Sequence, residues 1–375
     1  MKRTSTFTAI VLIAVVCVSC VRADAAEELA PPETKLRVYH VGNSLTRNIP
    51  LERLTQLFAS AGGSYEYGMQ LGGGMRLEQH LVKRSHGGPP GSAEYNLVEK
   101  YGPYDRALKT STFDALILQP YMERLDAEPQ WSSRYPYFTT GALQAATGFI
   151  DFARGRAKPS DEHADALPAN TEHTATERFY IYATWPKAEQ VLSRDGEKTY
   201  AAYWEAPYAG GVQPCREFFA QLVTRLNERR PDLKTPVRMI PAGEVLAALD
   251  KKIRRGELPG IEKFYARVQP YYLKARGPKS PFNPEAFQRD AGVLNLYADN
   301  VHMNDQPHNG ADSGAIGSYV AALTVYATLS GKSPVGLTVE PYEMFDADAD
   351  AELIRALQQT VWEVVAGHPH TGVDE

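Results

Sequence analysis

The sequence predicts an α/β fold, a three-layer α/β/α sandwich on a mostly parallel sheet, and two observations support this prediction. Short apolar runs alternate with stretches whose apolar residues recur at helical spacing, as in successive βα units. Residues 113–118 (FDALIL) are apolar with little alternation, which is typical of a strand buried on both faces. A strand of this kind needs helices on both sides of its sheet.

The first predicted elements each have a local cause. Residues 36–41 (LRVYHV) are a β-prone run, and residues 50–59 carry apolar side chains at helical spacing. Residues 65–71 are again strand-like and end at three consecutive glycines. Beyond them, Leu77 and Leu81 are four residues apart, which favours a helix.

The same alternation continues in the second half of the chain. Residues 178–184 (RFYIYAT) and 237–241 (VRMIP) are predicted strands. Residues 293–297 (VLNLY) are predicted as either a last strand or a short approach to a functional site. Helices are predicted at 218–226, 318–329 and 351–365.

A single domain is predicted at residues 34–366, with long loop insertions. Three connections exceed the usual length between strands, namely those near 120–177, 185–212 and 245–290. In open α/β sheets, ligand sites form outside the carboxyl ends of the strands. We interpret the three connections as insertions around such a site.

Residues 1–25 have the layout of a secretory signal peptide. A basic start is followed by an uncharged apolar run at 9–18, and Ala23 and Ala25 supply small residues for a cleavage site. The run is well short of the ~20 residues that span a bilayer, although a short uncleaved anchor is the alternative. Export to the periplasm or the extracellular space is expected, with lipoprotein anchoring at Cys20 as a minor alternative.

The charge balance argues against nucleic acid as a partner. The chain of 375 residues has 40 basic and 45 acidic residues, a formal net charge of -5, and therefore lacks a strongly basic footprint. Cleavage after Ala25 changes this charge to -7 and leaves Cys215 as the only cysteine. The mature chain must then be stabilised by its core without a disulfide, and no later apolar run predicts a membrane span.

The first strand is followed by a candidate nucleophile. The segment Gly42-Asn43-Ser44-Leu45-Thr46 puts Ser44 in a strand-to-helix turn, exposed and close to the backbone N–H groups of a helix N-terminus. Ser44 or Thr46 could equally cap the helix without any chemical role.

The next two strands end in candidate donors for an oxyanion. Gly74 closes the triple glycine of the second strand, where a backbone N–H can approach a reacting oxygen, although an ordinary turn has the same composition. Gln119 follows the third strand, and its amide can donate to an oxyanion or simply face solvent. The glycines do not form the G-x-G-x-x-G pattern of a dinucleotide site.

A candidate base and its orienting acid lie near the C-terminus. Asp299 precedes His302 by three residues, so both side chains can face a serine: the histidine accepts its proton, and the aspartate fixes the tautomer. Asp305 and His308 repeat this spacing. We favour Asp299 and His302 because they directly follow the apolar run 293–297, although a capping Asp beside a surface His has the same pattern.

Together these blocks resemble the SGNH (GDSL-like) hydrolase superfamily, in the G-N-S variant of a bacterial branch. The serine block is residues 42–46, the glycine block contains Gly74, and the final block is 299–302, in the family's order. The resemblance implies a flavodoxin-like three-layer sandwich. This chain departs from the family at Gln119, where the family has an Asn.

The resemblance also implies a catalytic triad of Ser44, His302 and Asp299 that hydrolyses an ester through an acyl-enzyme. The backbone N–H groups of Ser44 and Gly74 and the amide of Gln119 would form the oxyanion hole. No metal and no organic cofactor are required.

The predicted function is a secreted esterase that removes acetyl or other short acyl groups from carbohydrate. Tyr and Trp residues are frequent in the long connections and can stack on sugar rings, but they can equally pack those loops, and a lipid ester is a rival substrate. One alternative is a non-catalytic carbohydrate-binding protein on the same scaffold, suggested by Gln119. Another is a metal-dependent hydrolase with the ligands Asp299, His302, Asp305, His308 and Asp312.

Overall fold

The computed structural model describes most of the chain beyond the predicted signal peptide. Its described residues are 34–83, 93–121, 124–126, 130–131, 138–139, 141–155, 176–191, 200–208, 213–265, 291–297, 299–303 and 314–373. The predicted signal peptide and Cys20 lie outside them. Residues Thr34–Glu375 form one compact unit.

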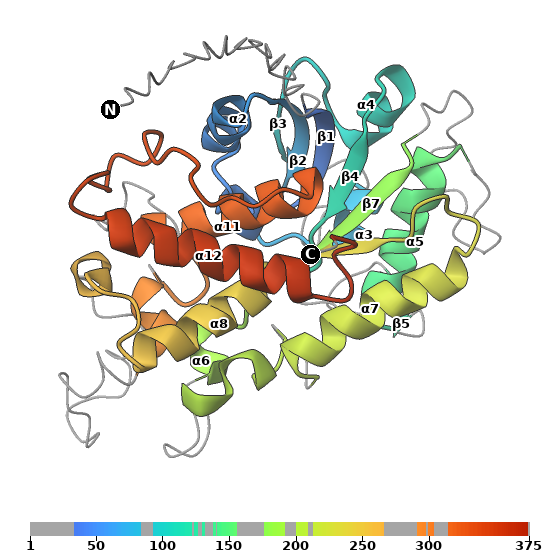
Figure 1. The fold of residues 1–375 in the computed structure, drawn as a ribbon. Helices are drawn as coiled ribbons and strands as arrows, with labels where there is room; N and C mark the ends of the chain where they lie inside the picture. The colour runs from blue at the N-terminus through green and yellow to red at the C-terminus, as the bar shows by residue number, and fades with distance from the viewer. Residues whose placement is uncertain are drawn as a thin grey trace, which may run out of the picture. The chain divides into compact units, whose positions relative to one another are not determined.

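A six-stranded sheet in the order β3-β2-β1-β4-β7-β8 organises this unit (Figure 1). Five strands run in parallel, and the short β3 pairs antiparallel with β2 at one edge. Without β3 the strand order is 2-1-3-4-5, which is the flavodoxin-like order. The strands are β1 (Lys35–Gly42), β2 (Ser64–Leu71), β3 (Asn96–Leu97), β4 (Ala115–Leu118), β7 (Arg178–Tyr182) and β8 (Arg238–Ile240).

Helices cover both faces of the sheet, so the predicted three-layer α/β fold is confirmed (Figure 1). One layer contains α2 (Leu51–Ser60), α8 (Ala242–Arg254), α11 (Gly314–Ser330) and α12 (Ala351–Gly367). The other contains α4 (Tyr104–Thr110), α5 (Gly141–Ala153) and α7 (Cys215–Arg229). The remaining elements are α1 (Ser44–Arg47), α3 (Leu77–Leu81), α6 (Ala188–Val191), the 3-10 helices η2 (Tyr200–Glu205), η3 (Ile261–Phe264) and η4 (Gly292–Leu296), and a hairpin of β5 (Gln130–Trp131) and β6 (Phe138–Thr139).

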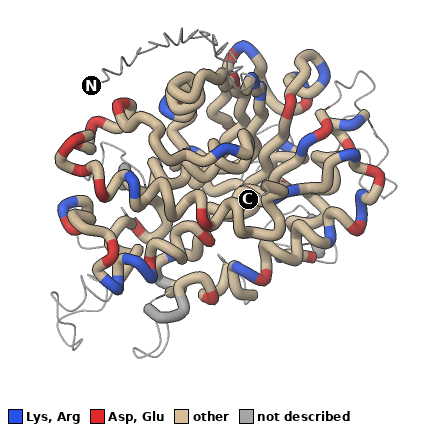
Figure 2. Tube along the Cα trace, viewed as in Figure 1, with Lys and Arg blue, Asp and Glu red and all other residues tan. Residues whose placement is uncertain are grey.

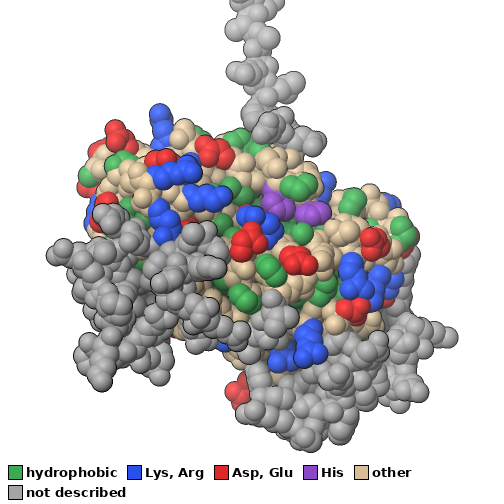
Figure 3. Space-filling model, turned by 90° about the horizontal axis from the view of Figure 1, so that it is seen from below, with side chains coloured by type: hydrophobic (Ala, Val, Ile, Leu, Met, Phe, Trp, Pro, Cys, Tyr) green, Lys and Arg blue, Asp and Glu red, His purple; other side chains and the backbone are tan. Residues whose placement is uncertain are grey.

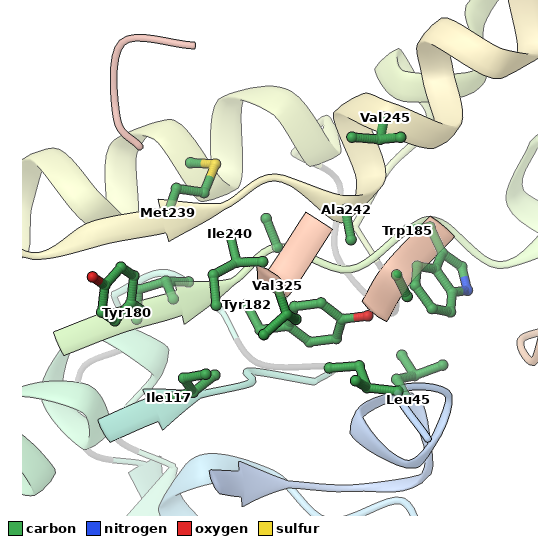
Figure 4. Close-up of a cluster of buried hydrophobic side chains, with 14 of the residues drawn as sticks. Leu45, Ile117, Tyr180, Tyr182, Trp185, Met239, Ile240, Ala242, Val245 and Val325 are labelled. Atoms are coloured by element: carbon green, nitrogen blue, oxygen red, sulfur yellow. The ribbon is translucent and has the colours of Figure 1, made fainter. Parts of the chain in front are cut away.

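The core lies on both sides of the central strands. All four residues of β4 are buried, as its unbroken apolar run predicts. On one side, Ile117 of β4 packs in a cluster with Tyr182 of β7, Ile240 of β8 and Val325 of α11 (Figure 4). Burial of each large apolar side chain of this kind contributes about 1.5–3 kcal/mol before chain entropy is counted.

The structure changes the description of three predicted segments. The connection 120–177 contains α5, a full helix that buries ten of its thirteen residues and has a narrow outer face of Gln144, Gly148 and Asp151 at helical spacing. The start of the connection 245–290 belongs to α8. The run 293–297 is not a strand: most of it forms η4, which leads to the candidate site.

Charged residues lie mainly on the helices and loops around the sheet, with both signs interspersed (Figure 2). The face in Figure 3 mixes charged and scattered apolar side chains. Among the described residues, Leu97 and Val335 are the exposed large hydrophobics. None of the helices in the described part of the chain has the length and apolar character needed to cross a membrane.

Candidate active site

The serine turn, residues 42–46, connects β1 to α1. Asn43 has extended backbone geometry and is the N-cap of α1, because its Oδ1 accepts a hydrogen bond from Leu45 N–H at 2.9 Å. The Asn43 amide donates to the carbonyl of Met75 at 3.1 Å, which joins the serine turn to the glycine turn after β2. Ser44 is the first residue of α1 and is half-buried. The short helix therefore begins at the candidate nucleophile.

Gln119 braces this turn from the end of β4. Its Oε1 accepts from the backbone N–H of Asn43 at 3.0 Å and from the hydroxyl of Thr46 at 3.1 Å, while its Nε2 donates to the carbonyl of Pro120 at 2.6 Å. The backbone N–H requires an acceptor, which fixes the orientation of the amide. Gln119 is also fully buried. The structure thus differs from the prediction that this amide faces an oxyanion, since its longer stem places it beneath the turn.

Glycine permits this close packing. A Cβ atom at Gly42 would collide with Thr46 Oγ1 and would lie 2.8 Å from Gln119 Oε1. Gly74 lies in the neighbouring glycine turn with φ 63°, in the left-handed region that favours glycine. Gly72 N–H donates to the carbonyl of Gly42 at 3.1 Å, so the two turns lie against each other. The structure therefore brings Gly74 into the neighbourhood of Ser44.

His302 reaches Ser44 from the opposite end of the chain. Its Nε2 lies 2.8 Å from Ser44 Oγ, although the two residues are 258 positions apart. Its Nδ1 lies 2.7 Å from Asp299 Oδ2. The three side chains that the sequence singled out thus form one hydrogen-bonded series, in the order expected of nucleophile, base and orienting acid.

Asp299 is arranged to stay ionised. Burial alone would raise its pKa, but hydrogen bonds from the His302 imidazole and from the N–H groups of Val301 and His302 outweigh burial, and the pKa is lowered. Its Oδ1 accepts from those two N–H groups at 2.7 and 2.8 Å. Because an ionised carboxylate can only accept hydrogen bonds, His302 Nδ1 must carry the ring proton. Nε2 is then unprotonated and can accept the hydroxyl proton of Ser44.

The histidine loop, residues 299–303, is supported by groups that the sequence did not identify as functional. The indole Nε1–H of Trp185 donates to Val301 O at 2.7 Å, and Ala188 N–H donates to Asn300 O at 2.8 Å. From α11, the Ser318 hydroxyl donates to Met303 O at 3.0 Å. One signal could have found Trp185: it follows the carboxyl end of β7, where sites of α/β sheets form.

Some of the residues behind the sugar-stacking and metal alternatives lie in the described part of the chain. Tyr203, Trp204 and Tyr208, three aromatics of the connection 185–212, are buried and pack in the core. Asp305, His308 and Asp312 lie outside the described residues. Within the described ranges, no three His, Cys, Asp or Glu side chains form a group that could hold a metal ion.

Comparisons with known proteins give two distant structural neighbours. Neither a protein-family model nor a curated protein matches the sequence. A DUF4886 family protein from Bacteroides uniformis is 16% identical, with 89% of this chain and 95% of that chain covered and a TM-score of 0.43. A gut microbial diltiazem-metabolizing enzyme is 14% identical, with 60% of this chain and 41% of that chain covered and a TM-score of 0.28.

Proposed function

We propose that this protein is a serine ester hydrolase of the SGNH type. The observation that carries the proposal is the series Asp299–His302–Ser44, with hydrogen bonds of 2.7 and 2.8 Å between side chains from two distant parts of the chain. A capping serine and a surface histidine would have no reason to meet in this order. A nucleophile whose base is oriented by a third group is the usual arrangement for acyl transfer.

The first half of the proposed reaction forms an acyl-enzyme. His302 Nε2 takes the proton from Ser44 Oγ as this oxygen attacks the acyl carbonyl carbon, and Asp299 stabilises the resulting imidazolium. Backbone N–H groups of Ser44 and Gly74 stabilise the negative charge on the former carbonyl oxygen. When the tetrahedral intermediate collapses, the carbon–oxygen bond to the alcohol breaks, and the alcohol leaves with the proton from His302.

The second half releases the acid. Water attacks the acyl carbon while His302 accepts a proton from it, and collapse of this second intermediate breaks the bond to Ser44 Oγ. The proton returns to Ser44, which restores the free enzyme. In this scheme Gln119 acts indirectly, because it holds the backbone N–H of Asn43 and the hydroxyl of Thr46 beside the nucleophile.

The proposed substrates are acetyl or other short acyl esters of carbohydrate, as small molecules or polysaccharides. The sugar part of this proposal depends on the predicted export and on the aromatic-rich connections in the sequence. It receives no support from Tyr203, Trp204 and Tyr208, which are buried. A panel of different esters can therefore test the serine ester chemistry and the substrate class independently.

The test compares the wild type with Ser44→Ala on p-nitrophenyl acetate, acetyl-xylan, acetylated monosaccharides and long-chain esters. We expect Ser44→Ala to lower kcat by on the order of 10⁴-fold or more. Ser60→Ala is the control, because among the described residues the Ser60 hydroxyl bonds only within its own helix end, to Leu57 O at 2.8 Å. Equal rates for wild type and Ser44→Ala would exclude the serine mechanism.

Two other outcomes would favour the alternatives. Binding of acetylated carbohydrate without turnover of any ester would favour a non-catalytic binding protein. Loss of activity on exhaustive chelation, with recovery on addition of a metal, would favour a metal-dependent hydrolase.

A further inference from the structure

Three hydrogen bonds connect the segment 185–188, directly after β7, to the chain around the histidine loop. Trp185 Nε1–H donates to Val301 O at 2.7 Å, across 116 residues of sequence. Ala188 N–H donates to Asn300 O at 2.8 Å, and the Tyr297 hydroxyl donates to Pro186 O at 2.7 Å. The two carbonyls that accept from Trp185 and Ala188 lie between Asp299 and His302 in sequence. The bonds therefore act where the position of both side chains is set.

The histidine loop depends on such bonds more than the serine turn does. It follows the 3-10 helix η4 and does not belong to any strand of the described sheet. No ladder of backbone hydrogen bonds therefore holds it in register with Ser44. Its distance to Ser44 must be maintained by individual contacts, and the bond from Trp185 ends on the residue directly before His302.

The Trp185 ring is held firmly enough to position the loop. The side chain is buried and meets Tyr182 edge-on, with ring centroids 6.5 Å apart. Figure 4 shows the ring and Leu45, the neighbour of Ser44, at the same end of the buried cluster. The donor is thus anchored in the core that also supports the serine turn.

We propose that the two hydrogen bonds from the segment 185–188 to the histidine loop, from Ala188 N–H and from Trp185 Nε1–H, position the proposed catalytic base, and that Trp185 is the main positioning residue. It acts on His302 through the carbonyl of Val301 and has no contact with the substrate. The inference rests on the proposed function and extends it to a residue outside the triad. Loss of the indole N–H would free the loop to shift, and shifts of about 1 Å in a catalytic group can cost on the order of 10²-fold in rate.

The test compares Trp185→Phe with Trp204→Phe. Both tryptophans are buried, but among the described residues Trp204 Nε1 has no hydrogen-bond partner, whereas Trp185 Nε1 bonds Val301 O. The same change of volume therefore removes a hydrogen bond only at Trp185. The measurements are the rate of Ser44 labelling by a fluorophosphonate, kcat and KM on p-nitrophenyl acetate, the melting temperature, and the far-downfield proton resonance of the His302–Asp299 hydrogen bond.

We expect Trp185→Phe to slow labelling and lower kcat by about tenfold or more with KM nearly unchanged, and to shift or broaden the downfield resonance. Trp204→Phe should lose a similar amount of melting temperature, but its labelling rate, its kcat and its downfield resonance should stay unchanged. Equal labelling rates and equal resonances in the two variants would overturn the inference. Absence of Ser44 labelling in the wild type would instead contradict the proposed function, and the resonance would then decide the positioning role alone.

A second variant serves if Trp185→Phe does not fold. Ala188→Pro removes the N–H that bonds Asn300 O, at the first residue of α6, a position where proline is well tolerated. We expect slower labelling of Ser44 in the same direction. Unchanged labelling and an unchanged resonance in a folded Ala188→Pro would overturn the inference that both bonds from the segment 185–188 position the loop.

Discussion

The serine turn and the histidine loop meet at one hydrogen bond, and the protein holds them in different ways. The serine turn continues from β1, which pairs with β2 on one side and β4 on the other, and Gly42, Asn43, Leu45 and Thr46 are buried. In the histidine loop, Asp299 and His302 keep side-chain exposures of 40% and 24%. The nucleophile is thus part of the sheet framework, while the base is attached to it from outside.

Because of this difference, substitutions in the two regions should affect stability and turnover to different extents. Changes beneath the serine turn disturb buried, fully packed groups, so they should lower the free energy of unfolding together with activity. Changes around the histidine loop remove single bonds from a partly exposed segment, so they should lower turnover with a smaller loss of stability. The following variants test this difference between the two regions.

The largest effect is expected at the base itself. His302→Ala should lower kcat by on the order of 10⁴-fold, because Ser44 then has no proton acceptor. His308→Ala should keep most of the activity, since Asp299 and Ser44 both bond His302. Steady-state kinetics on p-nitrophenyl acetate measures both variants. If His308→Ala is the inactive one, the second D-x-x-H pair carries the reaction.

Acid should destabilise the protein through two buried histidines, His40 of β1 and His80 of α3. Burial lowers the pKa of His40 and of His80 to about 3 each, so both stay neutral in the folded protein. Below the unfolded pKa of about 6.5, the unfolded chain binds protons that the folded protein does not. Stability is therefore present above about pH 6.5 and is lost as pH falls toward 3, by about 1.4 kcal/mol per pH unit for each histidine.

Urea unfolding at several pH values between 7 and 4 measures this slope. His40→Gln should reduce the slope of unfolding free energy against pH by about 1.4 kcal/mol per pH unit, the contribution of one histidine. His40 lies in β1 below the serine turn, and its Nε2 is 2.6 Å from the Tyr65 hydroxyl. A profile equally steep in wild type and His40→Gln would show that other groups govern the acid response.

Gln119→Met should reduce stability and turnover together. The substitution leaves the Asn43 N–H and the Thr46 hydroxyl without their buried acceptor, at a cost of roughly 1–3 kcal/mol for each orphaned group. Gln358→Met is the matched control, because Gln358 is also buried and donates to the Tyr319 hydroxyl and Leu337 O at 2.9 Å. It should lose stability but keep kcat. A loss of kcat in Gln119→Met without loss of stability would restore Gln119 as an oxyanion donor.

The smallest effect on stability is expected from substitutions at two glycines, Gly42 and Gly73. Gly42→Ala should cost about 1–3 kcal/mol, because its Cβ collides with Thr46 Oγ1 and crowds Gln119. A Cβ at Gly73 has no heavy atom within 4 Å, so Gly73→Ala should be nearly neutral. Thermal unfolding of the two variants is a direct comparison. Similar melting temperatures would mean that the serine turn has more freedom than its packing indicates.

Much of the site could be read locally. Ser44 follows an apolar strand, and Asp299 and His302 have a three-residue spacing, so each could be recognised from neighbouring residues alone. Strands such as β4 and β7 were visible for the same reason, since an unbroken apolar run is a local pattern. The helix α5 was missed because its outer face is narrow: Gln144, Gly148 and Asp151 are its unburied residues, and one of the three is a glycine, so the polar signal in the sequence is weak.

The residue types and their spacing, set by the sequence, determined the α/β class and the three candidate triad residues. The position of Gln119 beneath the serine turn, and the bond from Trp185 to Val301 across 116 residues, became visible in the folded chain and not in the sequence pattern. A side chain's partner across such a separation depends on strand order and helix packing, which combine contacts from the whole chain. Sequence patterns act over a few residues, whereas the positions of catalytic groups depend on which distant segments the core brings together.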